Sequence, residues 1–346
     1  MAPERRALER LWEGDGRLAR AARTALLPAE LMFRAITTGR NALYDRGILR
    51  SHALALPAVS VGNLSVGGTG KTPVSADVAR RLRARGARPG LVLRGYGGDE
   101  PQVHARLNPG VPVVVASDRV AGVERAAVLG ADIAVLDDAF QHRRARRDAD
   151  IVLISADQWP TGRPHLLPAG PWREPLAALA RASLVVITRK AASDAQVDAV
   201  RSALQRTRPA VPHAVAMLRP SGLAAVGGSE RLPMSALADR RVLALAAIGD
   251  PTAFVRQLTA AGARVVPAIF PDHHRFSRDD LAALDRDAAA VDLVVCTLKD
   301  AVKLELLWAR ARRPLWYVSQ SVEYEQGEEA MTSLLDRLLL DRTHAS

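Results

Sequence analysis

The chain has 346 residues, of which 48% are hydrophobic and 25% charged, so it can bury one large core or two medium ones, and its length favours two domains. Lysine and arginine outnumber aspartate and glutamate by 48 to 37, and the net charge of +11 indicates anionic partners such as phosphates, nucleic acid or acidic lipid headgroups, unless the arginines only reflect a GC-rich genome. The single Cys296 excludes an internal disulfide and a thiolate metal cluster, which favours a reducing, cytosolic compartment.

The first 50 residues are predicted to form a separate amphipathic segment. Residues 5–40 combine scattered leucines with eight arginines, the pattern of a basic amphipathic helix pair broken near Pro28. This segment could lie on an anionic membrane or pack as a surface helix on the core, and the pattern alone leaves both open. We expect no signal peptide and no transmembrane span, because no apolar run reaches the roughly 18 residues that a spanning helix needs.

Residues 51–212 alternate short apolar runs with stretches rich in alanine, arginine and leucine. This alternation is typical of a parallel sheet with helices on both faces, so we predict an α/β domain. The predicted strands cover 57–62, 90–93, 112–115, 132–136, 150–154 and 184–188. The predicted helices cover 71–86, 119–129, 174–181 and 194–207.

Residues 213–236 are predicted to be an extended hairpin linker, because this stretch is interrupted by Pro220 and Gly222 and then reaches Gly227 and Gly228. A second, smaller α/β domain is predicted for residues 237–346. Its expected strands cover 241–248, 264–269, 292–296 and 315–318, and its expected helices cover 251–261, 278–289, 299–311 and 327–341.

A glycine-rich turn between the first strand and the first helix resembles a phosphate-binding loop. Its glycines allow backbone N–H groups to approach a polyphosphate, Lys71 supplies charge to the β and γ phosphates, and Thr72 supplies a magnesium ligand. Ser65 stands where the usual pattern has glycine. The position between a strand and a helix predicts a P-loop NTPase-like fold that binds ATP with Mg²⁺. The predicted ATP-binding residues are Ser65, Val66, Gly67, Gly68, Thr69, Gly70, Lys71 and Thr72.

Two carboxylates, Asp137 and Asp138, end the apolar strand predicted at 132–136. P-loop proteins hold their magnesium at such a strand end, so one of the two is expected to reach the metal together with Thr72. An acidic pair is also common in ordinary turns, and the nearby P-loop gives the metal interpretation its weight.

A third motif runs from Arg94 to Pro101, directly after the second strand. The carboxyl edge of a parallel sheet is where α/β proteins place ligands, so a carboxylate such as Asp99 could accept the proton of a substrate hydroxyl. The alternative interpretation of this glycine-rich stretch is a solvated turn.

A fourth motif, Phe270 to Phe276, contains an aspartate followed by His273 and His274. Metal binding is one interpretation, although adjacent histidines point in different directions and no matching ligand cluster occurs elsewhere in the sequence. The other is that one histidine orients a catalytic carboxylate and tunes its pKa.

Taken together, these motifs resemble the tetraacyldisaccharide 4′-kinase family of lipid A assembly. The matching stretches span most of the chain and are Val-Gly-Asn-Leu-Ser-Val-Gly-Gly-Thr-Gly-Lys-Thr-Pro-Val (61–74), Arg-Gly-Tyr-Gly (94–97), Gly-Asp-Glu-Pro (98–101), Asp-Asp-Ala-Phe-Gln-His (137–142), Leu-Leu-Pro-Ala-Gly-Pro-Trp-Arg-Glu-Pro (166–175), Asp-His-His (272–274) and Thr-Leu-Lys-Asp-Ala-Val-Lys-Leu (297–304).

The resemblance implies transfer of the ATP γ-phosphate to the 4′-hydroxyl of a tetraacyldisaccharide 1-phosphate, with Asp99 as general base, His273 as its dyad partner and Glu100 arranging metal and base. It also implies that the N-terminal helices receive the lipid at the cytoplasmic face of the inner membrane, without nucleic acid or an obligatory protein partner. The substrate-binding candidates at matching positions are Arg94, Tyr96, Arg119, Gln141, His142 and Arg173.

The chain departs from the family pattern in the segment between Tyr96 and Asp99, which is shorter than the family's loop, and at Ala139, Trp172 and Leu298. None of these changes removes a proposed catalytic group, but the short loop could alter the acceptor preference.

Three other functions are compatible with parts of the sequence. A P-loop NTPase acting on nucleic acid suits the basic charge, but only 4% of residues are aromatic, so stacking platforms for bases are scarce. A nucleotide-binding membrane scaffold would not need a base near the γ-phosphate. A kinase of a soluble small molecule differs from a lipid kinase in having no lipid dependence.

Overall fold

The computed structural model describes residues 11–12, 14, 16–95, 98–160, 162, 164–249, 251–272, 274–308 and 313–344. The candidate site residues Tyr96 and His273 lie outside the described residues, as does the part of the predicted amphipathic segment before residue 11. The contacts divide the chain into a larger unit, within 8–95, 104–218 and 322–346, and a smaller unit, within 96–103 and 219–321.

The larger unit is built on a parallel sheet. Its strands are β1 (Ala58–Asn63), β2 (Pro89–Leu93), β3 (Val113–Val115), β4 (Ile133–Asp137), β5 (Ala149–Ser155), β6 (Leu184–Arg189) and the first part of β7 (His213–Ala225). They are hydrogen-bonded in the order β3-β2-β4-β1-β5-β6-β7, with Val61 opposite Asp137 where β1 meets β4. Strands β1, β2 and β4 are buried along their whole length, as expected for a sheet covered on both faces.

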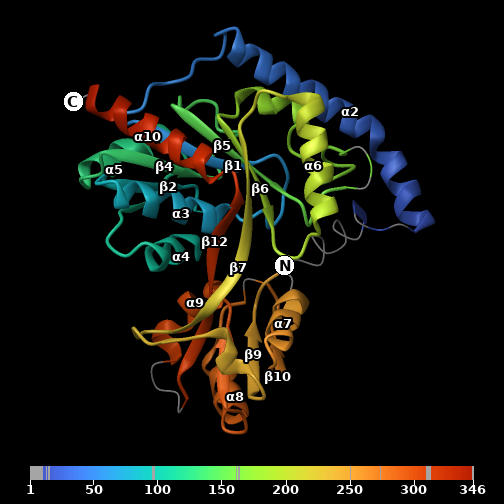
Figure 1. Cartoon of the computed structure of the whole chain (residues 1–346). Coiled ribbons are helices and arrows are strands. Elements are labelled where there is room, and N and C mark those ends of the chain that lie inside the picture. Colours follow the sequence, from blue (N-terminus) through green and yellow to red (C-terminus); the bar gives the residue numbers. More distant parts are fainter. Residues whose placement is uncertain are drawn as a thin grey trace. The chain divides into compact units, whose positions relative to one another are not determined.

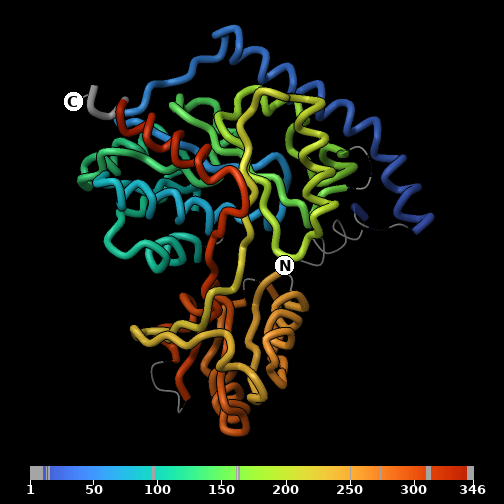
Figure 2. The backbone as a smooth tube through the Cα atoms, in the orientation of Figure 1, coloured from blue at the N-terminus to red at the C-terminus, as the bar shows by residue number. Residues whose placement is uncertain are grey.

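Helices pack on both faces of this sheet (Figures 1 and 2). On one face, residues such as Val78 of α3 (Lys71–Ala84) and Leu335 of α10 (Glu328–His344) share a core with alternate strand residues. On the other face, α6 (Asp194–Thr207) and the 3₁₀ helix η1 (Leu176–Arg181) form a second core, and α5 (Arg119–Val128) a third. The predicted strands and helices of this region are therefore confirmed within one to three residues at their ends.

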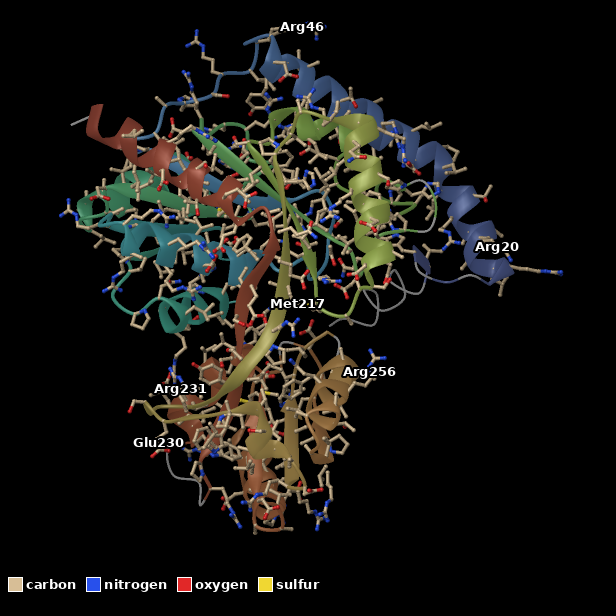
Figure 3. All side chains as sticks on the ribbon, in the orientation of Figure 1. Arg20, Arg46, Met217, Glu230, Arg231 and Arg256 are labelled. Carbon is tan, nitrogen blue, oxygen red and sulfur yellow. The ribbon has the colours of Figure 1, made fainter. Side chains whose placement is uncertain are left out.

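Helix α2 (Arg17–Asp45) is continuous through Pro28, so the predicted break into a helix pair is wrong. Pro28 is exposed, and water can bind the carbonyl that its missing N–H leaves unpaired. Phe33, on the inner side of α2, packs against the core that includes residues of α6. Arg20 and Arg46 lie near the two ends of α2 in Figure 3. No helix in the described part of the chain is long and apolar enough to cross a membrane.

The strands of the smaller unit are β9 (Arg241–Ala246), β10 (Arg264–Ile269), β11 (Leu293–Cys296) and the first part of β12 (Leu315–Gln326), hydrogen-bonded in the order β10-β9-β11-β12. The last part of β7 belongs to this unit and forms a hairpin with β8 (Arg231–Leu232), near the Glu230 and Arg231 labels of Figure 3. Cores on both faces include α7 (Pro251–Ala260), α8 (Arg278–Ala288), α9 (Leu298–Trp308) and the short η2 (Met234–Leu237).

The units differ from the predicted domain boundaries in several places, and residues 8–50 fall in the larger unit and 96–103 in the smaller one. Residues 213–225 form one unbroken strand, β7, and the division into units falls inside it, after Leu218. Residues 322–346, which include α10, belong to the larger unit and not to a C-terminal domain. The apolar pattern of α10 predicts that one face of the helix is buried, but it does not indicate which unit covers that face.

One helix of the site region is absent from the predicted elements. Helix α4 (Glu100–Leu107) begins where a solvated turn was the alternative interpretation, and Pro101 occupies its second position. Proline is tolerated there because the first N–H groups of a helix have no intrahelical partner. The division into units falls within α4, after Val103.

Candidate active site

The loop between β1 and α3 has the backbone conformation that its glycines permit. Gly67 and Gly70 have φ of 125° and 89°, in the range that residues with a Cβ rarely adopt. A Cβ on Gly70 would also lie 2.4 Å from Leu218 Cδ1. Gly70 immediately precedes α3, so the free N–H groups of the first helical turn are available at the end of the loop.

Neighbouring strands and loops fix this P-loop. Val66 N donates to Pro171 O at 2.8 Å, and Thr188 Oγ1 donates to Thr69 O at 2.9 Å. Asn63 Nδ2 donates to Thr69 Oγ1 at 2.8 Å. These bonds tie the loop to β1, to β6 and to the segment before η1, so it is held in shape by bonds within the protein.

Asp137, at the end of β4, is buried and its two oxygens are already hydrogen-bonded. Oδ1 accepts from Ser75 Oγ at 2.8 Å and from Asp138 N at 3.0 Å. Oδ2 lies 2.9 Å from Nε2 of His104, which is fully buried. Burial alone would raise the pKa of Asp137, but the bond with His104 and then that with Ser75 hold this pKa below its usual value.

Asp138 differs from Asp137 in that 37% of its side chain is exposed. Its φ of 48° turns it out of the line of the strand. Arg173 Nη1 lies 3.1 Å and Lys71 Nζ 3.9 Å from Asp138 Oδ1. The P-loop lysine, this carboxylate and Arg173 therefore form one charged group beside the loop.

This arrangement fits a magnesium ion that is shared with phosphates. Mg²⁺ prefers one or two carboxylates together with phosphate and water oxygens, and the accessible carboxylate of Asp138 and the hydroxyl of Thr72 supply that donor set. Asp137 has both oxygens occupied, so it fits a role in orienting the neighbouring residue. Among the described residues, no cluster of three His, Cys, Asp or Glu side chains could hold a metal by itself.

Two of the predicted substrate-binding residues donate hydrogen bonds to backbone carbonyls near the site. Arg119 is 1% exposed and donates to Ala116 O at 2.6 Å and to Asp137 O at 3.3 Å. Gln141 Nε2 donates to Asn63 O at 2.8 Å. Both side chains therefore support the ends of β4 and β1, and their predicted contacts with substrate stay untested.

His142 is partly buried and lies near Arg119. Burial, and then the charge of Arg119, lower the pKa of His142 to about 4, so its imidazole is neutral at neutral pH. Arg94, another predicted substrate contact, follows β2 and is exposed.

Asp99 and Glu100 belong to the smaller unit, in the segment that leads into α4. Asp99 is 4% exposed and lies on a cavity of about 340 Å³ whose wall also includes Gln102, His274 and Lys303. Lys303 Nζ is 3.8 Å from Asp99 Oδ2.

His274 has a partner of its own. Its Nε2 lies 2.9 Å from Asp280 Oδ2 at the start of α8, and its ring stacks on Phe270 at 4.9 Å. Of the two adjacent histidines, His274 is thus engaged in the smaller unit's own helix cap. His273, the predicted partner of Asp99, lies outside the described residues, so this pairing stays a prediction.

Sequence reasoning missed several residues that contact the predicted site residues, among them Ser75, His104 and Lys303. Ser75 follows Thr72 by one turn of α3, so its position on the same face of the helix could have indicated a role. His104 lies four residues after Glu100 on a helix that was not predicted. Lys303 lies within the 297–304 motif, and no pattern in the neighbouring sequence connects it to Asp99.

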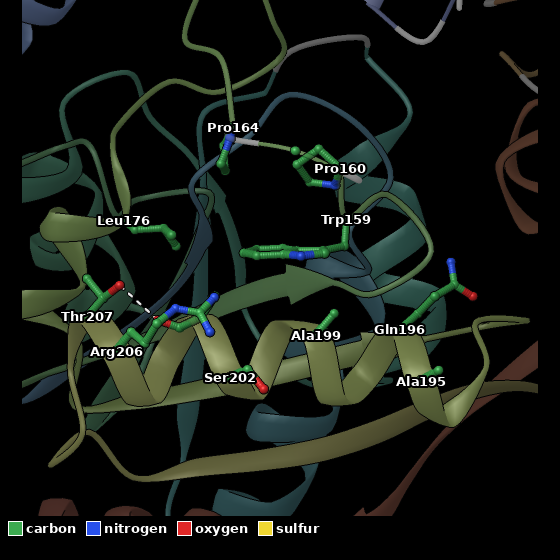
Figure 4. A pocket seen from close by; sticks show the side chains of 12 residues that line it. Trp159, Pro160, Pro164, Leu176, Ala195, Gln196, Ala199, Ser202, Arg206 and Thr207 are labelled. Atoms are coloured by element: carbon green, nitrogen blue, oxygen red, sulfur yellow. Dashed lines mark hydrogen bonds between the residues drawn. The ribbon is translucent and has the colours of Figure 1, made fainter.

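A second cavity, of about 740 Å³, lies in the larger unit beside α6 (Figure 4). Trp159 forms one wall and Ala199, Ser202 and Arg206 of α6 another. The cavity lacks the predicted catalytic and metal-binding residues. Trp159 packs edge-to-face on Trp172, at 5.8 Å between ring centroids, and this connects the cavity wall to the segment that holds the P-loop.

Comparison with known proteins gives a consistent result. A family model described as Tetraacyldisaccharide-1-P 4'-kinase, LpxK, matches residues 22–100 and 97–340. The two matched stretches overlap at residues 97–100, which include Asp99. The chain is 41% identical over 367 aligned residues to the Tetraacyldisaccharide 4'-kinase of Anaeromyxobacter dehalogenans strain 2CP-1, covering 96% of this chain and 95% of that relative.

A second relative, the Tetraacyldisaccharide 4'-kinase of Syntrophus aciditrophicus, is 38% identical over 337 residues and covers 87% of this chain and 90% of its own. Among solved structures, LpxK from Aquifex aeolicus in complex with ATP is similar with a TM-score of 0.73 and 30% identity, covering 92% of this chain and 99% of that one. The resemblance inferred from the motifs is thereby confirmed, and the chain belongs to the tetraacyldisaccharide 4′-kinase family.

Proposed function

We propose that this protein transfers the γ-phosphoryl group of ATP to the 4′-hydroxyl of a tetraacyldisaccharide 1-phosphate. The observation that carries the proposal is the P-loop with Lys71, Asp138 and Arg173 grouped beside it, in a chain of this kinase family. Phosphoryl transfer depends chiefly on positioning and on neutralising charge, and this charged group is suited to both.

ATP would lie along the backbone N–H groups of residues 67–72, with Lys71 at its β and γ phosphates. Thr72 and Asp138 would hold Mg²⁺, which supplies positive charge to the phosphate oxygens as the P–O bond to ADP breaks. Arg173 pairs with Asp138 at 3.1 Å, so it can keep that carboxylate in place before nucleotide arrives. Asp137 would orient this edge through Ser75 and His104.

Asp99 would accept the proton of the acceptor hydroxyl as its oxygen forms the new bond to phosphorus. The carboxylate has little contact with solvent, and neither of its oxygens accepts a hydrogen bond among the described residues. A base whose oxygens have no other hydrogen-bond donor, in a residue that lines a cavity, fits this role. His273 is proposed as its dyad partner and Glu100 as a group that arranges metal and base.

Helix α2 supports the proposed association with an anionic membrane surface. Leu18, Met32, Ile36 and Leu43 lie within about 40° of one another around the helix, and Leu18 is 88% exposed. Phe33, which packs on the core, lies about 60° to 100° around the helix from these residues. An apolar stripe that faces away from the protein is suited to lie on lipid at the cytoplasmic face of the inner membrane.

A vesicle co-sedimentation assay checks this surface. The double variant Met32→Glu/Ile36→Glu should bind anionic vesicles about tenfold less than the parent, because two charges would have to enter the apolar interface. Leu306→Glu, at an exposed position of α9, is the control. Equal binding of both variants and the parent would contradict a membrane role for α2.

The reaction itself is tested by following radiolabel from γ-labelled ATP into lipid by thin-layer chromatography. The acceptor is a tetraacyldisaccharide 1-phosphate in detergent micelles, and the comparison is between the parent and Asp99→Ala. The proposal predicts magnesium-dependent labelled lipid that is nearly lost in the variant. ATP binding without labelled lipid would favour a kinase of a soluble substrate or a nucleotide hydrolase.

A further inference from the structure

Lys303, on α9, lies between two buried carboxylates. Its Nζ is 3.8 Å from Asp99 Oδ2 and 3.6 Å from Asp300 Oδ1. Both acids and the lysine belong to the smaller unit. The ammonium is thus placed to offset the charge of two groups that would be costly to ionise by themselves.

Asp300 fixes the far side of this cluster to the scaffold. It is fully buried, and its Oδ2 accepts from Thr297 Oγ1 at 2.7 Å and from Ala247 N at 3.1 Å. Burial raises the pKa of Asp300, while Thr297, Ala247 and Lys303 oppose that rise. Lys303 therefore favours the ionised form of Asp300, and the attraction between the two groups helps to hold Lys303 in position.

The other side of the cluster borders a cavity. Asp99 and Lys303 both line the cavity of about 340 Å³, and 19% of the Lys303 side chain is exposed. The separation of 3.8 Å exceeds hydrogen-bond length, so Lys303 acts on Asp99 by charge and leaves its lone pairs free to accept a proton.

We propose that Lys303 is a positioning residue for Asp99: it keeps the Asp99 carboxylate ionised and directed at the cavity, and Asp300 anchors Lys303 for this task. The inference rests on the proposed role of Asp99 as general base. When Asp99 takes the hydroxyl proton, its charge is lost, and Lys303 retains Asp300 as its counterion. Lys303 thus has a counterion both before and after Asp99 takes up the proton, and it does not exchange a proton itself.

A purely structural alternative is that Lys303 only offsets the buried charge of Asp300. The two interpretations differ in what Lys303→Met does to the pH dependence of turnover. If Lys303 acts on Asp99, removing its charge makes the base harder to ionise, so the acidic limb of the kcat profile moves to higher pH. A structural role alone would lower the amount of folded enzyme without moving that limb.

The experiment measures kcat and KM for label transfer to the acylated disaccharide 1-phosphate between about pH 5.5 and pH 9, in full-length Lys303→Met, Lys303→Arg and parent protein. Lys299→Met, on the exposed side of the same helix, is the matched control. Binding of a fluorescent ADP analogue and thermal unfolding are measured on each protein.

We expect Lys303→Met to lower kcat at neutral pH by about tenfold or more and to move the acidic limb up by about one pH unit, with ADP affinity within about twofold of the parent. Lys303→Arg should recover kcat to within about threefold, and Lys299→Met should match the parent.

The inference is overturned if Lys303→Met keeps the parental kcat and pH profile. It is equally overturned if the loss comes with lower thermal stability, an unmoved acidic limb and no recovery in Lys303→Arg. Failure of the proposed function has a different signature, because Asp99→Asn would then retain parental turnover, or the parent itself would transfer no label to lipid.

Discussion

His104 Nε2 lies 2.9 Å from Asp137 Oδ2, and both side chains are buried. The other oxygen of Asp137 accepts from Ser75 on α3. The carboxylate at the end of β4 is therefore held from two helices, α4 and α3. Because Asp138 follows it directly, this clamp sets the backbone that presents Asp138 to Lys71.

Replacing His104 by alanine should lower the free energy of unfolding by about 3 kcal/mol, because a buried carboxylate loses a charge-assisted hydrogen bond. Urea unfolding measures this change. His165→Ala is the matched control, since His165 also pairs with a carboxylate, Glu30, at 2.8 Å, but is 43% exposed and leaves Arg34 beside the acid. A control loss as large as that of His104→Ala would contradict a special role for the buried pair.

The two adjacent aspartates should respond differently to neutralisation. Asp138→Asn should lower kcat on the order of a hundredfold or more while changing the unfolding free energy by less than about 1 kcal/mol, because its side chain is partly exposed and serves the metal. Asp137→Asn should cost about 2 kcal/mol or more in stability. Steady-state kinetics over a range of magnesium concentrations, together with urea unfolding, test this. Equal effects on both readouts would show that the two acids do not divide these roles.

Gly70→Ala should abolish nucleotide binding. The added Cβ combines a positive φ with a contact of 2.4 Å to Leu218 Cδ1, so the loop has to move. Gly86→Ala is the control, since Gly86 also has positive φ, 82°, but has nothing within 4 Å of an added Cβ. It should cost about 1 kcal/mol in stability and leave ADP affinity unchanged. Titration with a fluorescent ADP analogue distinguishes them, and tight binding by Gly70→Ala would contradict the P-loop geometry.

His142 should make the protein less stable as the pH falls from 6.5 towards 4. Its folded pKa is lowered from 6.5 to about 4, mainly by burial, so in this window the unfolded chain binds a proton that the folded chain excludes. The stability is complete above pH 6.5, and about 2 kcal/mol is lost across the window, allowing for partial exposure. His142→Asn should flatten this part of the urea-unfolding profile, and parallel profiles for variant and parent would refute the assignment.

Local patterns were sufficient to predict the sheet of the larger unit and the P-loop. Strand β1, the glycine turn and α3 are consecutive in the chain, so the alternation of apolar runs and the positions of Gly67 and Gly70 specify them together. The sequence also predicted the two acids at the end of β4, for the same reason. It did not predict their different environments, because these depend on His104 and Arg173, which lie far away in the sequence.

The remaining differences also come from long-range contacts. The interruption by Pro220 and Gly222 favoured a linker, yet β7 continues through both residues. Strand β8 pairs with the last part of β7. A Cβ on Gly222 would lie 2.7 Å from Leu232 O, so this close pairing requires glycine there. The Lys303 and Asp99 pair joins positions about 200 residues apart, and no periodicity reports such a contact. Pro28 favoured a break in α2, and the sequence does not show that this proline is exposed, where water can replace its missing N–H.

The most direct test of the central claim is to locate the transferred phosphate in the product. Parent protein is incubated with ATP, Mg²⁺ and tetraacyldisaccharide 1-phosphate, and the lipid product is analysed by ³¹P NMR while ADP is quantified. The account predicts a second phosphate at the 4′ position, one ADP for each product molecule, and no product from Lys71→Ala. ADP and free phosphate in equal amounts with unmodified lipid, or near-normal turnover by Lys71→Ala, would contradict it.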